Sequence, residues 1–156
     1  MNQSYLDYIN ILKCFIHSGK PELSVTPDWK AIMKLAQINS TLGIVGYVVM
    51  DNPMLVDQET FSFLRKQCLK EIAIYSRRAE QMKALIEIMN ERKIDHLLFK
   101  GFRVRDYYTV PELRTFGDID FVIRKRDRKK SDALMRGWNI WTLWKRCEHC
   151  FLKKSE

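Results

Sequence analysis

The sequence predicts an α+β domain, α/β in its core, in which a helical N-terminal part (residues 1–92) precedes a small sheet with helices (residues 93–156). Through most of the first part, apolar residues recur every three or four positions, as on one face of a helix. Residues 96–99 then form a short apolar run that indicates a buried strand, and residues 118–123 alternate as a strand does. The apolar fraction of 46% is sufficient for a packed core.

The first two helices are predicted from their apolar stripes and their start signals. Residues 5–16 repeat apolar side chains at helical spacing, and Ser4 with Asp7 resembles a capping pair. A second helix is expected to begin at Pro27, because proline suits the first helical position and Thr26 can cap it.

The rest of the N-terminal part is predicted to be helical as well. Residues 42–50 are nearly all apolar and fit either a strand or a buried helix, and their length and neighbours favour the helix. A turn at residues 51–53 follows. Residues 57–90 then keep one face apolar over many turns, which predicts one long helix, or two with a kink.

Two carboxylates stand on the second predicted strand. Side chains two positions apart share a face of a strand, so Asp118 and Asp120 should project together, while Ile119, Phe121 and Ile123 pack inward. Adjacent carboxylates repel each other unless a cation lies between them, and Mg²⁺ prefers oxygen ligands. The simpler interpretation is a half-exposed strand whose outer face carries two acids.

Residues suited to phosphate lie upstream. Gly101 follows the apolar run 96–99 and allows close approach of the backbone to a ligand, and residues 102–108 can start a helix whose N-terminal amides favour an anion. Lys100 offers a point charge and Arg114 a planar fork, both of which suit phosphate oxygens.

This arrangement resembles the nucleotidyltransferases of the DNA polymerase beta superfamily, and most of all a poorly characterised bacterial branch. The shared motifs are a Leu-Lys-Gly turn, here Phe99-Lys100-Gly101, a Tyr-x-x-Pro-x-x-Arg loop, here residues 108–114, and an Asp-x-Asp strand, here residues 118–120. The resemblance implies a minimal nucleotidyltransferase-like sheet, with Gly101 opening the nucleotide-binding helix and with Asp118 and Asp120 holding two Mg²⁺ ions.

The implied reaction moves a nucleoside monophosphate from an NTP to an acceptor hydroxyl. The acceptor is left open between a protein side chain, a small molecule and an RNA end. In this superfamily a third carboxylate comes from a later strand, for which residues 147–153 are the candidate, but Glu148 and Glu156 are the only acids after Gly137. The core is therefore expected to be incomplete at its C-terminus, and a catalytically impaired relative that binds nucleotide or a partner protein is the alternative.

Charge and composition bound the other possibilities. The net charge of +8 favours anionic partners, and much of the excess lies in residues 124–130. A basic nucleic-acid-binding module is a further alternative. However, the basic run contains no aromatic residues that could stack on bases, so the favoured interpretation of residues 124–130 is a solvent-exposed loop followed by the first turn of a helix. No secretion signal or membrane span is expected from the pattern of basic and apolar residues, and the four cysteines lack framework spacing, so a cytoplasmic protein is expected.

Overall fold

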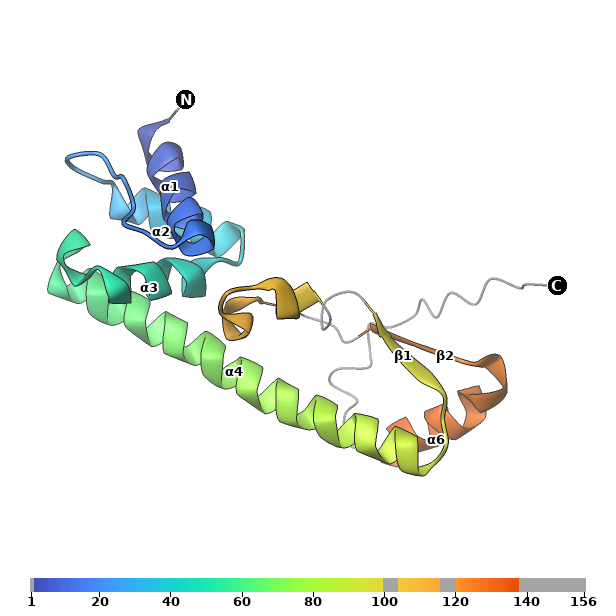
Figure 1. Ribbon diagram of the computed structural model, residues 1–156. Coiled ribbons are helices and arrows are strands. Elements are labelled where there is room, and N and C mark those ends of the chain that lie inside the picture. The colour runs from blue at the N-terminus through green and yellow to red at the C-terminus, as the bar shows by residue number, and fades with distance from the viewer. Residues whose placement is uncertain (1, 100–103, 116–119, 138–156) are drawn as a thin grey trace. The chain divides into compact units, whose positions relative to one another are not determined.

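The computed structural model describes residues 2–99, 104–115 and 120–137, with the backbone alone for Phe99, Asp120 and residues 135–137 (Figure 1). These residues combine helices with a two-stranded antiparallel sheet, which confirms the predicted α+β class. They fall into two compact units: one joins the residues up to Arg77 to Tyr107–Thr115, and the other comprises the described residues of 78–106 and 116–156. The candidate third strand, residues 147–153, lies outside the described residues.

The first unit begins with three short helices. They are α1 (Gln3–His17), α2 (Trp29–Ile38) and α3 (Leu42–Asp51), and a 3₁₀ turn, η1 (Pro53–Leu55), follows them. The predicted helices are confirmed, including the buried helix at residues 42–50, where Val45 and Val49 are fully buried.

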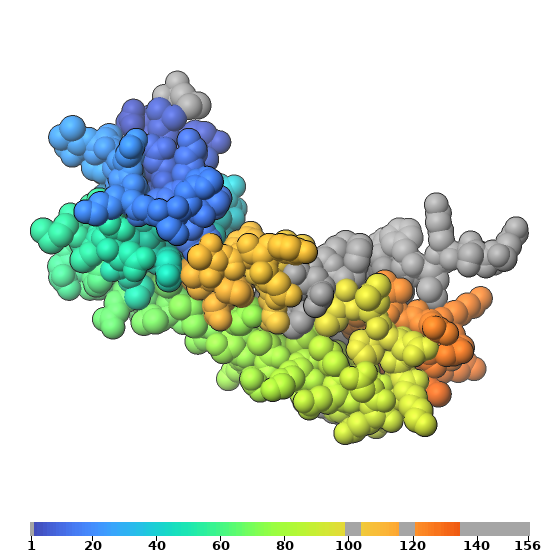
Figure 2. Space-filling view, in the orientation of Figure 1, coloured from blue at the N-terminus to red at the C-terminus, as the bar shows by residue number. Residues whose placement is uncertain are grey.

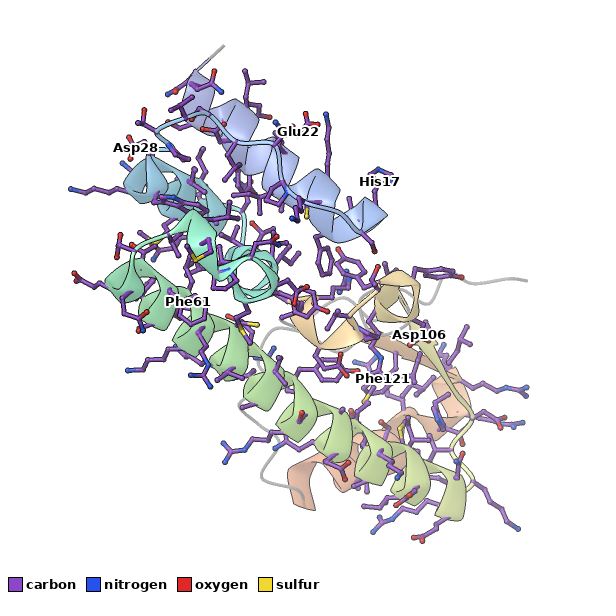
Figure 3. All side chains as sticks on the ribbon, turned by 60° about the vertical axis from the view of Figure 1, so that its left-hand side comes forward. His17, Glu22, Asp28, Phe61, Asp106 and Phe121 are labelled. Carbon is purple, nitrogen blue, oxygen red and sulfur yellow. The ribbon has the colours of Figure 1, made fainter. Side chains whose placement is uncertain are left out.

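Both predicted caps are wrong, because a neighbouring side chain takes the capping position. The Asn2 side chain accepts a hydrogen bond from the Ser4 N–H (3.1 Å), so α1 starts before Ser4. Likewise the Asp28 carboxylate, labelled in Figure 3, accepts from the Ala31 N–H (3.0 Å), so α2 starts two residues after Pro27. In each case the amide or carboxylate oxygen satisfies an otherwise unpaired N–H of the first turn.

Asp7 has a different role from the predicted cap. Its carboxylate is buried and accepts hydrogen bonds from the Ser24 N–H (2.9 Å), the Ser24 hydroxyl (2.7 Å) and the Gln3 side chain (3.2 Å). Burial acts to raise the pKa of this carboxyl, but the hydrogen bonds from Ser24 and Gln3 together hold the pKa below its ordinary value of 3.8. Asp7 thus fixes the loop between α1 and α2 to α1.

The long helix is a single element, α4 (Gln58–Glu91), as the first of the two sequence-based alternatives predicted. Asp57 caps it by accepting from the Thr60 N–H (2.8 Å). Its residues up to Arg77 belong to the first unit and the remainder to the second. No helix within the described residues has the length and apolar character of a membrane span.

The core of the first unit lies between α1, α2, α3 and the first part of α4. Gly46 is the point of closest approach between α3 and α4, because a Cβ there would lie 2.5 Å from the Leu64 carbonyl oxygen. The buried members of this core are Tyr8, Ile11, Phe15, Ile32, Ala36, Ile44, Val45, Val48, Val49, Leu64, Cys68 and Leu113.

The second unit packs a short sheet on helices. Strands β1 (His96–Phe99) and β2 (Asp120–Ile123) pair antiparallel, and η4 (Lys125–Asp127) leads into α6 (Arg128–Gly137). Ile123 is buried and Phe121 (Figure 3) packs against the same cluster, so the predicted inward face is confirmed for these two residues. The other buried residues of the cluster are Met82, Leu85, Met89, Ile94 and Leu134.

Candidate functional site

The register of the sheet places one end of each strand side by side. Phe99, the last residue of β1, pairs with Asp120, the first residue of β2. The chain therefore leaves β1 and enters β2 at the same end of the sheet, called the motif end below. Lys100 and Gly101 directly follow Phe99 in the sequence, and Asp118 stands two residues before Asp120. These three predicted site residues lie outside the described residues.

The two faces of the sheet differ in exposure. Leu98 and Phe121, opposite each other, pack against the core of the second unit, whereas Leu97 and Val122, also opposite each other, are 66% and 44% exposed. Since successive residues of a strand alternate between faces, the sheet has one packed face and one open face.

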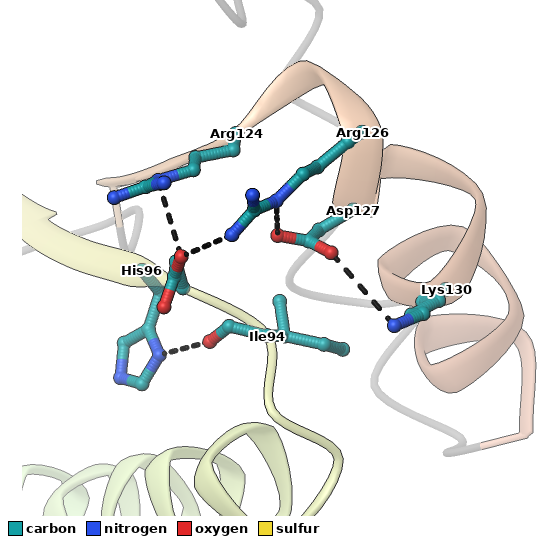
Figure 4. Close-up of polar contacts among 7 residues, drawn as sticks. Ile94, His96, Arg124, Arg126, Asp127 and Lys130 are labelled. Atoms are coloured by element: carbon teal, nitrogen blue, oxygen red, sulfur yellow. Dashed lines mark hydrogen bonds and ion pairs between the residues drawn. The ribbon is translucent and has the colours of Figure 1, made fainter.

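The basic run is located at the other end of the sheet, where β1 begins and β2 ends (Figure 4). One Asp95 oxygen lies 3.1 Å from Arg124 Nε and 2.9 Å from Arg126 Nη2. The buried Asp127 carboxylate lies 3.6 Å from Arg126 Nε and 3.9 Å from Lys130 Nζ. These cations are thus partly neutralised by acids. The strand pair nearest to them, His96 and Ile123, is three residues along the strands from the motif end, or about 10 Å.

Arg114 lies in the first unit, at the end of a 3₁₀ turn, η3 (Pro111–Leu113). Its backbone N–H donates to the Pro111 carbonyl (3.3 Å) and closes the turn. Its side chain is half-buried, and the guanidinium carbon lies 5.9 Å from the centre of the Tyr108 ring, within cation–π range. The Tyr-x-x-Pro-x-x-Arg spacing therefore brings its first and last residues into contact.

The loop that carries Arg114 is anchored in the helical core of the same unit. Leu113 is only 1% exposed, and the Thr115 hydroxyl donates to the Ser40 carbonyl (3.0 Å). A Cβ on Gly43 would lie 3.4 Å from Leu113 Cδ2, so this loop and α3 are closely packed. Sequence reasoning missed this anchor. The only sign of the anchor in the sequence is Leu113, the apolar residue immediately before Arg114. An apolar residue at that position is compatible with a surface turn as well as with a core contact.

Two pockets of the first unit flank Tyr108, where the 107–115 segment lies against the helices (Figure 2). A half-open pocket of about 410 Å³ is bordered by α1, the start of α3 and this segment, and its described lining residues are Leu12, Phe15, Ile16, Thr41, Ile44, Tyr107, Tyr108 and Thr109. A smaller pocket of about 120 Å³ is polar and includes Arg114, and its lining residues are Asn39, Ser40, Thr41, Ile44, Tyr108, Leu113, Arg114 and Thr115.

Over the residues whose side chains are described, no three carboxylate, imidazole or thiol groups gather in a way that could hold a metal ion. The predicted magnesium ligands are not among those residues, since Asp118 is not described and Asp120 is described by its backbone alone.

At the motif end, Lys100-Gly101 follows β1 in the sequence and the Asp-x-Asp motif ends at the first residue of β2, which is the order of motifs on which the resemblance to nucleotidyltransferases rests. Comparison with known families agrees: residues 26–149 match a family described as uncharacterised nucleotidyltransferase, and the chain belongs to that family. No curated protein and no solved structure matches the chain. The match begins just before α2, so the family domain includes most of the N-terminal helices as well as the sheet.

Proposed function

We propose that this protein transfers a nucleoside monophosphate from an NTP to an acceptor hydroxyl and releases pyrophosphate. Membership of a nucleotidyltransferase family supports the general reaction. In this proposal Asp118 and Asp120 are the catalytic carboxylates, and Lys100, Gly101 and Arg114 bind the triphosphate.

The observation that carries the proposal is the pairing of Phe99 with Asp120. Phosphate transfer needs phosphate-binding groups near the carboxylates, because both act on the same triphosphate. Lys100 and Gly101 directly follow Phe99 in the sequence and Asp118 stands two residues before Asp120, which supports a shared site.

The donor set fits magnesium. Two carboxylates at alternate positions offer hard oxygen ligands on one side of a strand, and the open sheet face, on which Val122 is 44% exposed, gives a ligand access. Mg²⁺ held by Asp118 and Asp120 would neutralise charge on the triphosphate and favour deprotonation of the attacking hydroxyl. Lys100 supplies a cation for the phosphates, Gly101 lets backbone amides approach them, and the Arg114 guanidinium can donate two parallel hydrogen bonds to phosphate oxygens.

The test is calorimetry of NTP binding with and without Mg²⁺, followed by a pyrophosphate-release assay with mixed protein, small-molecule and RNA acceptors. Asp118→Asn and Asp120→Asn should each abolish the effect of Mg²⁺ on binding. Asp51→Asn is the matched control, because Asp51 is exposed at the end of α3. Undiminished Mg²⁺-dependent binding in both site variants would overturn the proposal.

A further inference from the structure

We infer that the 410 Å³ pocket of the first unit holds the purine base of the NTP, while the adjoining polar pocket holds a phosphate at Arg114. This inference rests on the proposed function, since it names the nucleotide that the reaction uses. All of the residues that carry it belong to the first unit.

The first argument is the chemistry of the large pocket. Three aromatic residues, Phe15, Tyr107 and Tyr108, contribute to its wall, and aliphatic side chains supply most of the rest. None of its described lining residues carries a charge, so the pocket suits a neutral, flat ring system better than a phosphate or a polyamine. Its volume is within the range of about 300–1,000 Å³ that small-molecule sites occupy.

The second argument is the junction with the small pocket. Thr41, Ile44 and Tyr108 line both pockets, and Arg114 lines the small one. A neutral apolar space therefore adjoins a polar space with a cation, with Tyr108 at the boundary. A nucleotide has the same order of parts, because a neutral base is joined through a sugar to anionic phosphates.

The third argument concerns which base is bound. Thr41 has little hydrogen-bonding capacity to spare, because its hydroxyl already contacts the Tyr8 hydroxyl (2.8 Å) and the Ala36 carbonyl (3.4 Å). The other polar side-chain groups of the described lining are hydroxyls. With no amide or carboxylate side chain there to read a base edge, stacking area should dominate. We expect ATP and GTP to bind with similar affinity and both to bind more tightly than CTP or UTP.

The rim of the pocket allows a clean test, because two of its residues are highly exposed. Tyr107 is 89% exposed and Ile16 is 64% exposed, so changing them should not disturb folding. Tyr107→Ala removes a stacking face and Ile16→Glu places a negative charge at the rim. Each should weaken ATP and GTP binding on the order of tenfold, whereas Tyr107→Phe should retain it.

Matched controls come from exposed residues that do not line the pocket. Met54→Ala and Ile38→Glu alter side chains that are 96% and 70% exposed, and both should bind ATP like the wild type. Circular dichroism confirms folding of every variant, and isothermal calorimetry with Mg²⁺ and each of the four NTPs measures affinity. Adenosine, followed by saturation-transfer NMR, probes the base pocket without phosphates or metal.

The outcomes separate this inference from the proposed function. Mg²⁺-dependent NTP binding that is unchanged in Tyr107→Ala and Ile16→Glu would overturn the base pocket and leave the reaction standing. Adenosine binding that these variants lose, without any Mg²⁺-dependent NTP binding, would keep the pocket and overturn the metal site. CTP binding as tight as ATP binding, or no binding of adenosine and ATP to the wild type, would also overturn the inference.

Discussion

Replacing Leu113 with alanine should loosen the loop that carries Arg114. Leu113 is 1% exposed and belongs to the core of the first unit. Removing a buried leucine side chain from such a core costs about 2–5 kcal/mol of unfolding free energy, depending on how far the cavity collapses. Small proteins have net stabilities of about 5–15 kcal/mol, so much of the variant should remain folded at low temperature. The hydrogen bond from Thr115 to Ser40 and the packing of Tyr108 and Val110 against the same core would remain.

The assay compares Leu113→Ala with Leu64→Ala, which removes an equally buried leucine from the same core. Urea unfolding followed by circular dichroism should show a comparable destabilisation for both. NTP affinity, measured where both variants are folded, should fall on the order of tenfold only for Leu113→Ala, because only there does the guanidinium lose its fixed position. Equal NTP affinities for the two variants, or a loss of less than about 1 kcal/mol in Leu113→Ala, would refute the anchoring role.

Three further predictions concern single groups. Arg114→Lys keeps the positive charge but loses the planar fork, so calorimetry should show weaker NTP binding with an unchanged melting temperature. Gly46→Ala should lower the unfolding free energy by about 1–3 kcal/mol in urea titrations, because its Cβ would lie 2.5 Å from the Leu64 carbonyl oxygen, whereas Gly19→Ala, with no atom within 4 Å of its Cβ, should not. Because folding lowers the pKa of Asp7, its ionised form stabilises the folded state above about pH 4, and this contribution is lost as the pH falls through the folded-state pKa. The wild type should therefore be more stable than Asp7→Asn at neutral pH, by about 1–3 kcal/mol, and the difference should shrink in acid titrations of stability.

The helices could be predicted from sequence because apolar residues that recur every three or four positions are compatible with few structures other than a helix. The stripe over residues 57–90 corresponds to α4 within one residue at each end. The caps could not be predicted, since several residues able to cap stand close together. Asn2 competes with Ser4, and Asp28 competes with Thr26. The choice at α1 also depends on a tertiary contact, because Asp7 binds Ser24 in the next loop.

The two strands could be predicted from an apolar run and from alternation, but the surroundings of Arg114 could not. Alternation over residues 118–123 correctly assigned Phe121 and Ile123 to the packed face. Nothing in the local sequence shows that residues 107–115 pack on helices that precede them by more than 50 residues. Such contacts depend on the complementary shape of Gly43 and Leu113, which becomes visible only in the folded chain. Three statements remain predictions: the boundary near residue 92 between the helical part and the sheet, the identity of the magnesium ligands, and the acceptor of the nucleotide.

The anchored loop also gives the Pro-x-x-Arg spacing a physical reason. Pro111 begins the 3₁₀ turn, where its fixed φ angle is favourable and its missing N–H is not needed. Two residues later the turn directs Leu113 into the helical core, and the next residue, Arg114, closes the turn through its backbone while its side chain stays half-buried beside Tyr108. A spacing one residue shorter would place a charged guanidinium where the core requires an apolar side chain, at a cost of several kcal/mol. The proline and leucine thus fold the loop, and the arginine beside them is held in a position set by the helices of the first unit.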